Sequence, residues 1–347
     1  MKTGCQTTTK VLLLHQSQSF VSQHQQKSES GLYKHQNTAN LDLVIKKYNL
    51  DAIYADSKST AQELLNILNG MELSVPSLHV AEQLKEIGNS AYQLNHAAEN
   101  YLAHQFRTHQ LVSQLWQKIL RQNSGKTVAV VTTKETHQVL IGFALGLSSE
   151  RYHVLQQSSQ GFSILNFTNA EEKSAQLTAF NTATHLGTNL PQIQTGKKGL
   201  LLLLLAANTP QQQLESIAEF LQPESLNYIL SGDLNQAASV TEKLLLEQPK
   251  ALHLQVLRND FPEIWQHALL SRQTPMSQEE KQILVTGLVI ANETILTSLL
   301  EQVFGNQPTN LAPDSLAVIH YPPGNQLPIL DTLISSETLQ LELARCE

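Results

Sequence analysis

The chain has 347 residues and a formal net charge of −7, with 41% hydrophobic and 15% charged residues. This length fits two domains of about 150 residues each, and the composition excludes a disordered chain. The charge is uneven: residues 1–195 hold 15 Lys and Arg against 13 Asp and Glu, whereas the remainder holds 8 against 17. An acidic half repels phosphate backbones, so we expect no nucleic-acid partner.

Cysteine and apolar runs bound the chain further. Cys5 and Cys346 lie near opposite ends and form neither a disulfide framework nor a metal-ligand spacing, so we expect no cofactor. The apolar run at 200–207 is far shorter than the roughly 20 residues of a membrane-spanning helix. The run at 11–14 is too short for a signal peptide. We therefore expect a cytoplasmic protein without a membrane span.

The first predicted element is a buried parallel strand at residues 10–14, which stops in five polar residues at 15–19. Ligands of open α/β sheets bind just past the carboxyl ends of such strands, so residues 15–19 are a candidate site. The Gln- and Ser-rich stretch at 17–40 favours a long loop or a partly disordered segment. A helix at 41–48 and a strand at 52–54 are predicted to follow.

Apolar periodicity continues along both halves of the chain. The first half predicts helices near 61–68 and 101–120 and a buried strand at 127–131. The second half predicts a similar order of elements, with strands near 201–204, 228–231, 283–288 and 318–321 and a helix at 237–246.

The stretch from Lys10 to Ser19 resembles the first motif of the phosphoglycerate mutase-like histidine phosphatases. In that family the strand runs into Arg-His-Gly, then Glu or Gln, then Ser or Thr. Aligning Gln18-Ser19 with the last pair places His15 at the arginine and Gln16 at the nucleophilic histidine. A register one residue earlier keeps His15 as the nucleophile but places Leu14 at the arginine.

The resemblance continues along the first half. Thr60 falls on a phosphate-binding arginine, Gln93 on the catalytic acid and Thr133 on the second histidine. Residues 145–167 closely follow the helix, turn and edge strand of the family. The resemblance therefore implies an α/β fold with a three-layer α/β/α arrangement and a mostly parallel central sheet.

The second half repeats this order more weakly, which a tandem duplication would explain. The resemblance places Leu205, Ala206, Gln236 and Leu288 at the second copy's first arginine, nucleophile, second arginine and second histidine. We therefore predict two tandem domains at 1–194 and 199–340, a linker at 191–199 and a tail at 341–347.

The resemblance implies chemistry that these replacements remove. A histidine must attack phosphorus, arginines must hold the phosphoryl oxygens, and a carboxylic acid must protonate the leaving group. We therefore expect a catalytically inactive protein that binds another protein or a complex. Two alternatives remain: residual phosphatase activity through His15, and a sensor of a small ligand or phosphate ester in the first domain. The sensor pocket would be lined by His15, Gln16, Thr60, Gln93 and Thr133.

Overall fold

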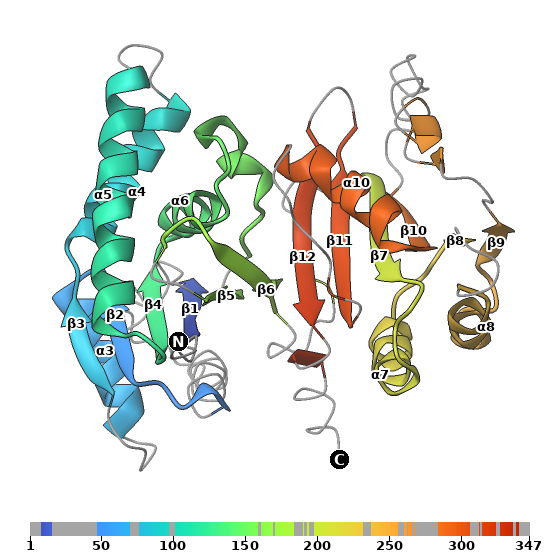
Figure 1. The fold of residues 1–347 in the computed structure, drawn as a ribbon, viewed down its shortest axis with the longest axis horizontal. Helices are drawn as coiled ribbons and strands as arrows, with labels where there is room; N and C mark the ends of the chain where they lie inside the picture. Colours follow the sequence, from blue (N-terminus) through green and yellow to red (C-terminus); the bar gives the residue numbers. More distant parts are fainter. Residues whose placement is uncertain are drawn as a thin grey trace, which may run out of the picture. The chain divides into compact units, whose positions relative to one another are not determined.

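The computed structural model shows a mixed α/β protein (Figure 1). The structure describes residues 8–15, 47–69, 76–96, 101–158, 161–168, 171–183, 190, 193, 198–231, 237–255, 260–261, 263–265, 267, 284–305, 312, 314–323, 327–335 and 338–339. The predicted loop at 17–40 and tail at 341–347 lie outside these residues, as do most of the helix predicted at 41–48 and of the linker predicted at 191–199.

The chain divides into two compact units. The first unit comprises Met1–Tyr152 and Gln157–Thr178, and the second comprises His153–Gln156 and Ala179–Glu347. The division falls inside a strand, ahead of the stretch predicted as a linker. The predicted domain limits of 1–194 and 199–340 remain a prediction.

The first unit is built on a mostly parallel sheet. Its strands lie in the order β3-β2-β4-β1-β5-β6. Their bounds are β1 Thr9–His15, β2 Ala52–Ala55, β3 Ser77–Val80, β4 Thr127–Thr132, β5 Phe162–Phe167 and β6 Ala175–Thr182. Strands β1 to β4 are parallel to one another, and β5 is antiparallel to β1. The resemblance predicted that the strand now seen as β5 lies at an edge of the sheet. Strand β5 is internal, because β1 lies on one side of it and β6 on the other.

Helices connect these strands. They are α3 Lys58–Asn69, α4 Gln83–His96, α5 Tyr101–Gln122 and α6 Lys134–Ala144, with a 3₁₀ helix at Ser149–Val154. Helix α3 packs on β2 and β3, whereas α4, α5 and α6 pack on one another. The crossovers β2-α3-β3 and β3-α4-α5-β4 run in opposite directions across the sheet. Since such crossovers are right-handed, α3 and the α4–α6 group lie on opposite faces, which makes three layers.

The second unit has the same topology. Its strands lie in the order β12-β11-β7-β10-β8-β9, so each strand has a first-unit counterpart at the same place in the chain order. They are β7 Gly199–Ala206, β8 Tyr228–Ser231, β9 Leu252–Gln255, β10 Leu284–Ala291, β11 Ser315–Tyr321 and β12 Ile329–Ser335. The helices are α7 Gln211–Leu221, α8 Ala237–Glu247 and α10 Glu293–Phe304.

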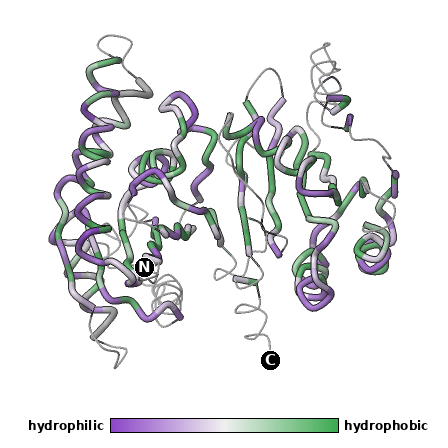
Figure 2. Tube along the Cα trace, in the orientation of Figure 1, coloured by the Kyte–Doolittle hydropathy of each residue, from purple (hydrophilic) through white to green (hydrophobic). Residues whose placement is uncertain are grey.

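The apolar pattern explains these elements. Helices α5 and α7 carry both hydrophobic and hydrophilic residues along their length, as expected of helices with one buried face (Figure 2). Strand β7 is instead apolar at seven consecutive positions, Leu200–Ala206, all of them buried. Both of its faces are therefore covered, as the uninterrupted apolar run predicts. The predicted α/β fold and most of its elements are confirmed.

Candidate functional site

The carboxyl ends of β1, β4 and β2 meet at one edge of the first unit. Strand β4 lies between the other two, and His15 at the end of β1 is the register partner of Thr132 at the end of β4. The sheet therefore brings His15, Thr60 and Thr133 to the edge where a ligand site is expected. Gln16 lies outside the described residues. Gln93 is in α4, and the structure does not describe its side chain.

His15 is held in one tautomer. Its Nδ1 lies 2.7 Å from the carbonyl oxygen of Ser158. Because a carbonyl oxygen only accepts, Nδ1 carries the proton, and the lone pair of the neutral ring is on Nε2. The backbone N–H of His15 donates to the carbonyl of Gly161 at 3.3 Å. Burial lowers the pKa of His15, an effect that the Ser158 carbonyl and the charge of Glu135 only partly oppose.

A second histidine lies beside it. The ring centroid of His137 in α6 is 6.1 Å from that of His15. His137 is fully buried, and its Nδ1 donates to Oε1 of Gln157 at 3.3 Å. Burial, reinforced by the nearby His15, lowers the pKa of His137 to about 3. Both rings are therefore neutral at neutral pH and give the site no cation.

Sequence reasoning missed His137. The second histidine was sought at position 133, directly after the strand, where the structure has the residue that precedes α6. In a helix that starts at Lys134, residue 137 lies one turn beyond residue 133 and on the same side. The four-residue spacing was a usable signal, but it required the start of α6 to be known.

Thr60 belongs to the start of α3. Its hydroxyl donates to Oδ1 of Asp56 at 2.8 Å, and its backbone N–H donates to Oγ of Ser57 at 3.2 Å, which is an N-cap contact. The resemblance places a phosphate-binding arginine at position 60. In the structure the hydroxyl of Thr60 is instead hydrogen-bonded to the carboxylate of Asp56. Lys58 and Lys134 begin α3 and α6 at this edge.

Thr133 makes a different contact. Its hydroxyl is 3.2 Å from that of Thr136, which in turn donates to the carbonyl of Leu84 in α4. A Cβ on Gly88 of α4 would lie 2.7 Å from Oγ1 of Thr136, so α4 and the first turn of α6 are in close contact here. The threonine hydroxyls therefore help to join two helices.

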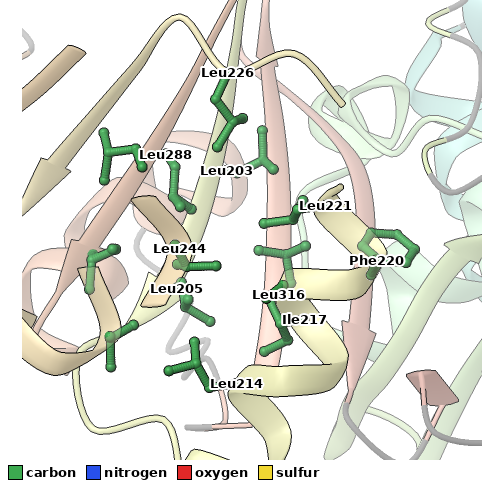
Figure 3. Close-up of a cluster of buried hydrophobic side chains, with 14 of the residues drawn as sticks. Leu203, Leu205, Leu214, Ile217, Phe220, Leu221, Leu226, Leu244, Leu288 and Leu316 are labelled. Atoms are coloured by element: carbon green, nitrogen blue, oxygen red, sulfur yellow. The ribbon is translucent and has the colours of Figure 1, made fainter. Parts of the chain in front are cut away.

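The corresponding positions of the second unit lie in its core. Leu205 and Leu288 are fully buried in a cluster with Leu214 and Ile217 of α7 and Leu244 of α8 (Figure 3). Ala206 at the end of β7 is also buried. Gln236 lies outside the described residues.

The register differs from the prediction at two of these positions. Ala206 pairs with Ala291 at the ends of β7 and β10, as His15 pairs with Thr132 in the first unit. Leu288 lies three residues before the end of β10, because Val289, Ile290 and Ala291 extend the apolar strand. Asn292, the N-cap of α10, is therefore the counterpart of Thr133, and Ala206 is the counterpart of His15.

The described residues bear on metal binding and on membrane spanning. Among the described residues, no group of three or more His, Cys, Asp or Glu is arranged to hold a metal ion. Within the same residues, no helix is long and apolar enough to cross a membrane.

Of the comparisons with known proteins, only the one with solved structures found matches. No protein-family model matches the sequence, and neither does any curated protein. Among solved structures, phosphoserine phosphatase from Entamoeba histolytica is 19% identical, covering 51% of this chain and 99% of its own, with a TM-score of 0.36. Phosphoglycerate mutase from Bacillus anthracis is 13% identical, covering 52% and 95%, with a TM-score of 0.35. A putative phosphohistidine phosphatase, SixA from Agrobacterium tumefaciens, is 14% identical over 40% and 98%, with a TM-score of 0.30.

In fold, the chain is similar to the phosphoglycerate mutase-like histidine phosphatases. The resemblance read from the sequence is to the same family. Each of the structures named above covers about half of this chain or less.

Proposed function

We propose that this chain is a catalytically inactive histidine phosphatase-like protein that works as a binding, scaffold, assembly or regulatory subunit. Its partner is another protein or a complex, and its two units arose by tandem duplication. Identical strand orders support the duplication, as do helices at matching places: α3 after β2 and α8 after β8, and α6 after β4 and α10 after β10. The proposed chain keeps the fold but has lost the catalytic residues. It would therefore work by binding a partner through its surface.

The hydrogen bond from Thr60 to Asp56 is the observation that carries the proposal. Phosphoryl transfer depends on cations that offset the charge of the phosphate oxygens. Here a carboxylate stands beside the position expected for a phosphate-binding arginine, and the two neighbouring histidines are neutral. At these three positions, therefore, nothing supplies the positive charge that a phosphate ester needs.

The second unit supports the same conclusion by packing. Leu205, Ala206 and Leu288 are all less than 5% exposed. An apolar cluster fills the region around Leu205 and Leu288 (Figure 3). Ala206, the counterpart of His15, carries no group that could attack phosphorus or hold its oxygens.

Phosphatase assays test the proposal. Purified full-length protein would be incubated with p-nitrophenyl phosphate and with a panel of phosphorylated metabolites between pH 5 and pH 9. We expect no turnover above background, and the same result for His15→Ala. Turnover well above background that is lost in His15→Ala would overturn the proposal.

The binding role is tested separately. The full chain, immobilised through a terminal tag, would be used to capture proteins from a native lysate, with His15→Ala alongside. A stoichiometric partner retained by both proteins supports a scaffold or assembly role. Absence of any stoichiometric partner at low ionic strength contradicts it.

Residual phosphatase activity through His15 is the second candidate. The hydrogen bond from Nδ1 to Ser158 favours it, because it leaves the neutral ring with its lone pair on Nε2, the form a nucleophile requires. Acid-labile phosphohistidine at position 15, trapped after mixing with a phosphate ester, would identify this activity. Its absence from rapidly quenched digests would exclude it.

The ligand sensor remains a prediction. Its polar pocket depends on Gln16 and Gln93, whose side chains the structure does not describe. A metabolite that raises the melting temperature of the wild-type protein but not of Gln16→Leu would support it. Equal shifts in both proteins would place the ligand elsewhere.

A further inference from the structure

An apolar face is exposed at the outer strand of the second unit. Strand β9 ends the strand order and pairs with β8 (Figure 1). Leu252 of β9 is the register partner of Tyr228 and is 60% exposed, and Leu254 is 45% exposed. Residues two apart in a strand point to the same face, so the two leucines lie together with the half-buried Tyr228. These three residues are called the β9 face below.

Helix α8 lies on the opposite face of these strands. Ile229 follows Tyr228 in β8 and is buried in one cluster with Leu244 of α8. Side chains alternate between the two faces of a strand, so the β9 face points away from α8. The helix that joins β8 to β9 therefore does not cover it.

The first unit shows what covers this face of the sheet. Tyr54 and His79 are register partners in β2 and β3, as Leu230 and Leu254 are in β8 and β9, and each lies one residue before the end of its strand. The ring of Tyr54 stacks on that of His79, with centroids 4.8 Å apart. The hydroxyl of Tyr54 donates to Oε1 of Gln122 in α5 at 3.0 Å. In the first unit, a helix therefore lies against this face.

The second unit is too short at this point to repeat α4 and α5. These helices have 14 and 22 residues and lie between β3 and β4, within residues 81–126. The matching interval between β9 and β10, residues 256–283, holds fewer residues than the two helices together. It therefore cannot supply a helix pair of that length, and the exposed fractions of Leu252 and Leu254 agree with this.

The two leucines are not required by the fold. Strand β3, the outer strand of the first unit, carries Ser77 and His79 at the places of Leu252 and Leu254. Polar side chains at these places are therefore enough to build such a strand. Neighbouring exposed leucines gain free energy when a further surface covers them, which is typical of an interaction site.

We propose that the β9 face docks a basic amphipathic helix of a partner protein, in the place that α5 takes in the first unit. The proposal rests on the binding role proposed above and gives that role a surface. A strand added to the free side of β9 would extend the sheet in its own plane and leave the leucines exposed. A helix laid across the face buries them.

The charge of the second unit determines the charge of the helix. The residues after 195 hold 8 Lys and Arg against 17 Asp and Glu. This excess of negative charge attracts a basic helix and repels an acidic one. A second copy of the chain would bring the same acidic unit to the face, which disfavours self-association there. The occupant is therefore a helix with apolar residues at positions i, i+3, i+4 and i+7 and Lys or Arg on its other side.

Peptide binding to the full-length protein tests the proposal. Fluorescence anisotropy at pH 8 would compare three labelled peptides: an amphipathic helix of Leu and Lys, a peptide of the same composition whose leucines share no face, and an amphipathic helix of Leu and Glu. We expect the first peptide to bind at least about tenfold more tightly than the other two. Added salt should weaken its binding, because the attraction between the charges is screened.

Variants of the β9 face locate the binding. Leu252→Ser with Leu254→His introduces the residues of β3 and should weaken binding of the basic helix at least about tenfold. Leu246→Ser is the matched control, because Leu246 in α8 is 76% exposed, and it should leave binding unchanged. Leu254→Lys places a positive charge on the face and provides a second reading if the double variant fails to fold.

Four results would each overturn the proposal: equal binding of the peptide whose leucines share no face, undiminished binding in the β9-face variants, an equal loss in Leu246→Ser, or self-association of the wild type that the double variant abolishes. Capture from a native lysate separates this proposal from the binding role itself. A stoichiometric partner retained equally by the wild type and the double variant would leave the binding role standing and exclude the β9 face. A partner lost from the double variant but retained by Leu246→Ser supports both.

Discussion

The rings of His15 and His137 lie with their centroids 6.1 Å apart, and burial keeps both neutral. Each also donates from Nδ1, one to a backbone carbonyl and the other to a glutamine oxygen. This pair lies at the carboxyl edge of the sheet, where His15 ends β1. Both rings are neutral and hydrogen-bonded, but only His137 is fully buried.

The pair predicts sensitivity to acid. The pKa of His137 is about 3 in the folded protein and near 6.5 when unfolded, so the unfolded state binds the proton first as the pH falls. The neutral, buried His137 therefore contributes its full share to the free energy of unfolding above pH 6.5. This contribution, on the order of a few kcal/mol, is lost progressively toward pH 3. Urea unfolding between pH 7 and pH 4 measures it. His137→Gln should lose less stability over this range than the wild type does; an unchanged slope would contradict the assignment.

Replacement of Leu205 tests the core of the second unit. Leu205→Ala removes a fully buried side chain and should lower the free energy of unfolding by about 2–5 kcal/mol. Leu246 in α8 is 76% exposed, so Leu246→Ala should change it by less than about 0.5 kcal/mol. Chemical denaturation monitored by circular dichroism compares the two. Similar effects would mean that Leu205 does not contribute to the core.

Thr60 should contribute to stability and not to phosphate binding. Thr60→Val keeps the shape but leaves Asp56 without this donor, at a cost of about 1–3 kcal/mol. Phosphate or sulfate at 10 mM should raise the melting temperature of neither protein. A phosphate-dependent increase that Thr60→Val abolishes would assign the threonine to a binding site.

Gly142 should be intolerant of a side chain. A Cβ at this position would lie 2.2 Å from Cδ1 of Tyr152, a clash that outweighs the gain of about 1 kcal/mol from the helix propensity of alanine. Gly142→Ala should therefore be destabilising by about 1–3 kcal/mol. Tyr152→Ala would be added as a relief variant, and the double mutant should be less destabilised than the sum of the two single changes. Additive effects would show that the two residues do not compete for space.

Local pattern was enough to predict the elements of the sheet. Strand β8 occupies the residues predicted for it, and β1 and β4 exceed their predicted bounds by one or two residues, because an apolar run with polar ends specifies a buried strand by itself. The predicted helix at 101–120 matches α5, because its apolar residues recur with the period of a helix. The order of the strands in the second half was also readable from the sequence, and in the structure it is the same as in the first half.

Register and long-range contacts could not be predicted this way. The end of β10 was placed three residues early, because an apolar strand carries no internal mark of where it ends, and the pairing of Ala206 with Ala291 decides it. His137 reaches His15 only because α6 returns along the sheet. The contact between Gln156 and Asp331 joins residues far apart in the chain. The hydrophobic pattern of a segment predicts which of its faces is buried. Which distant side chains share those surroundings is decided by tertiary packing.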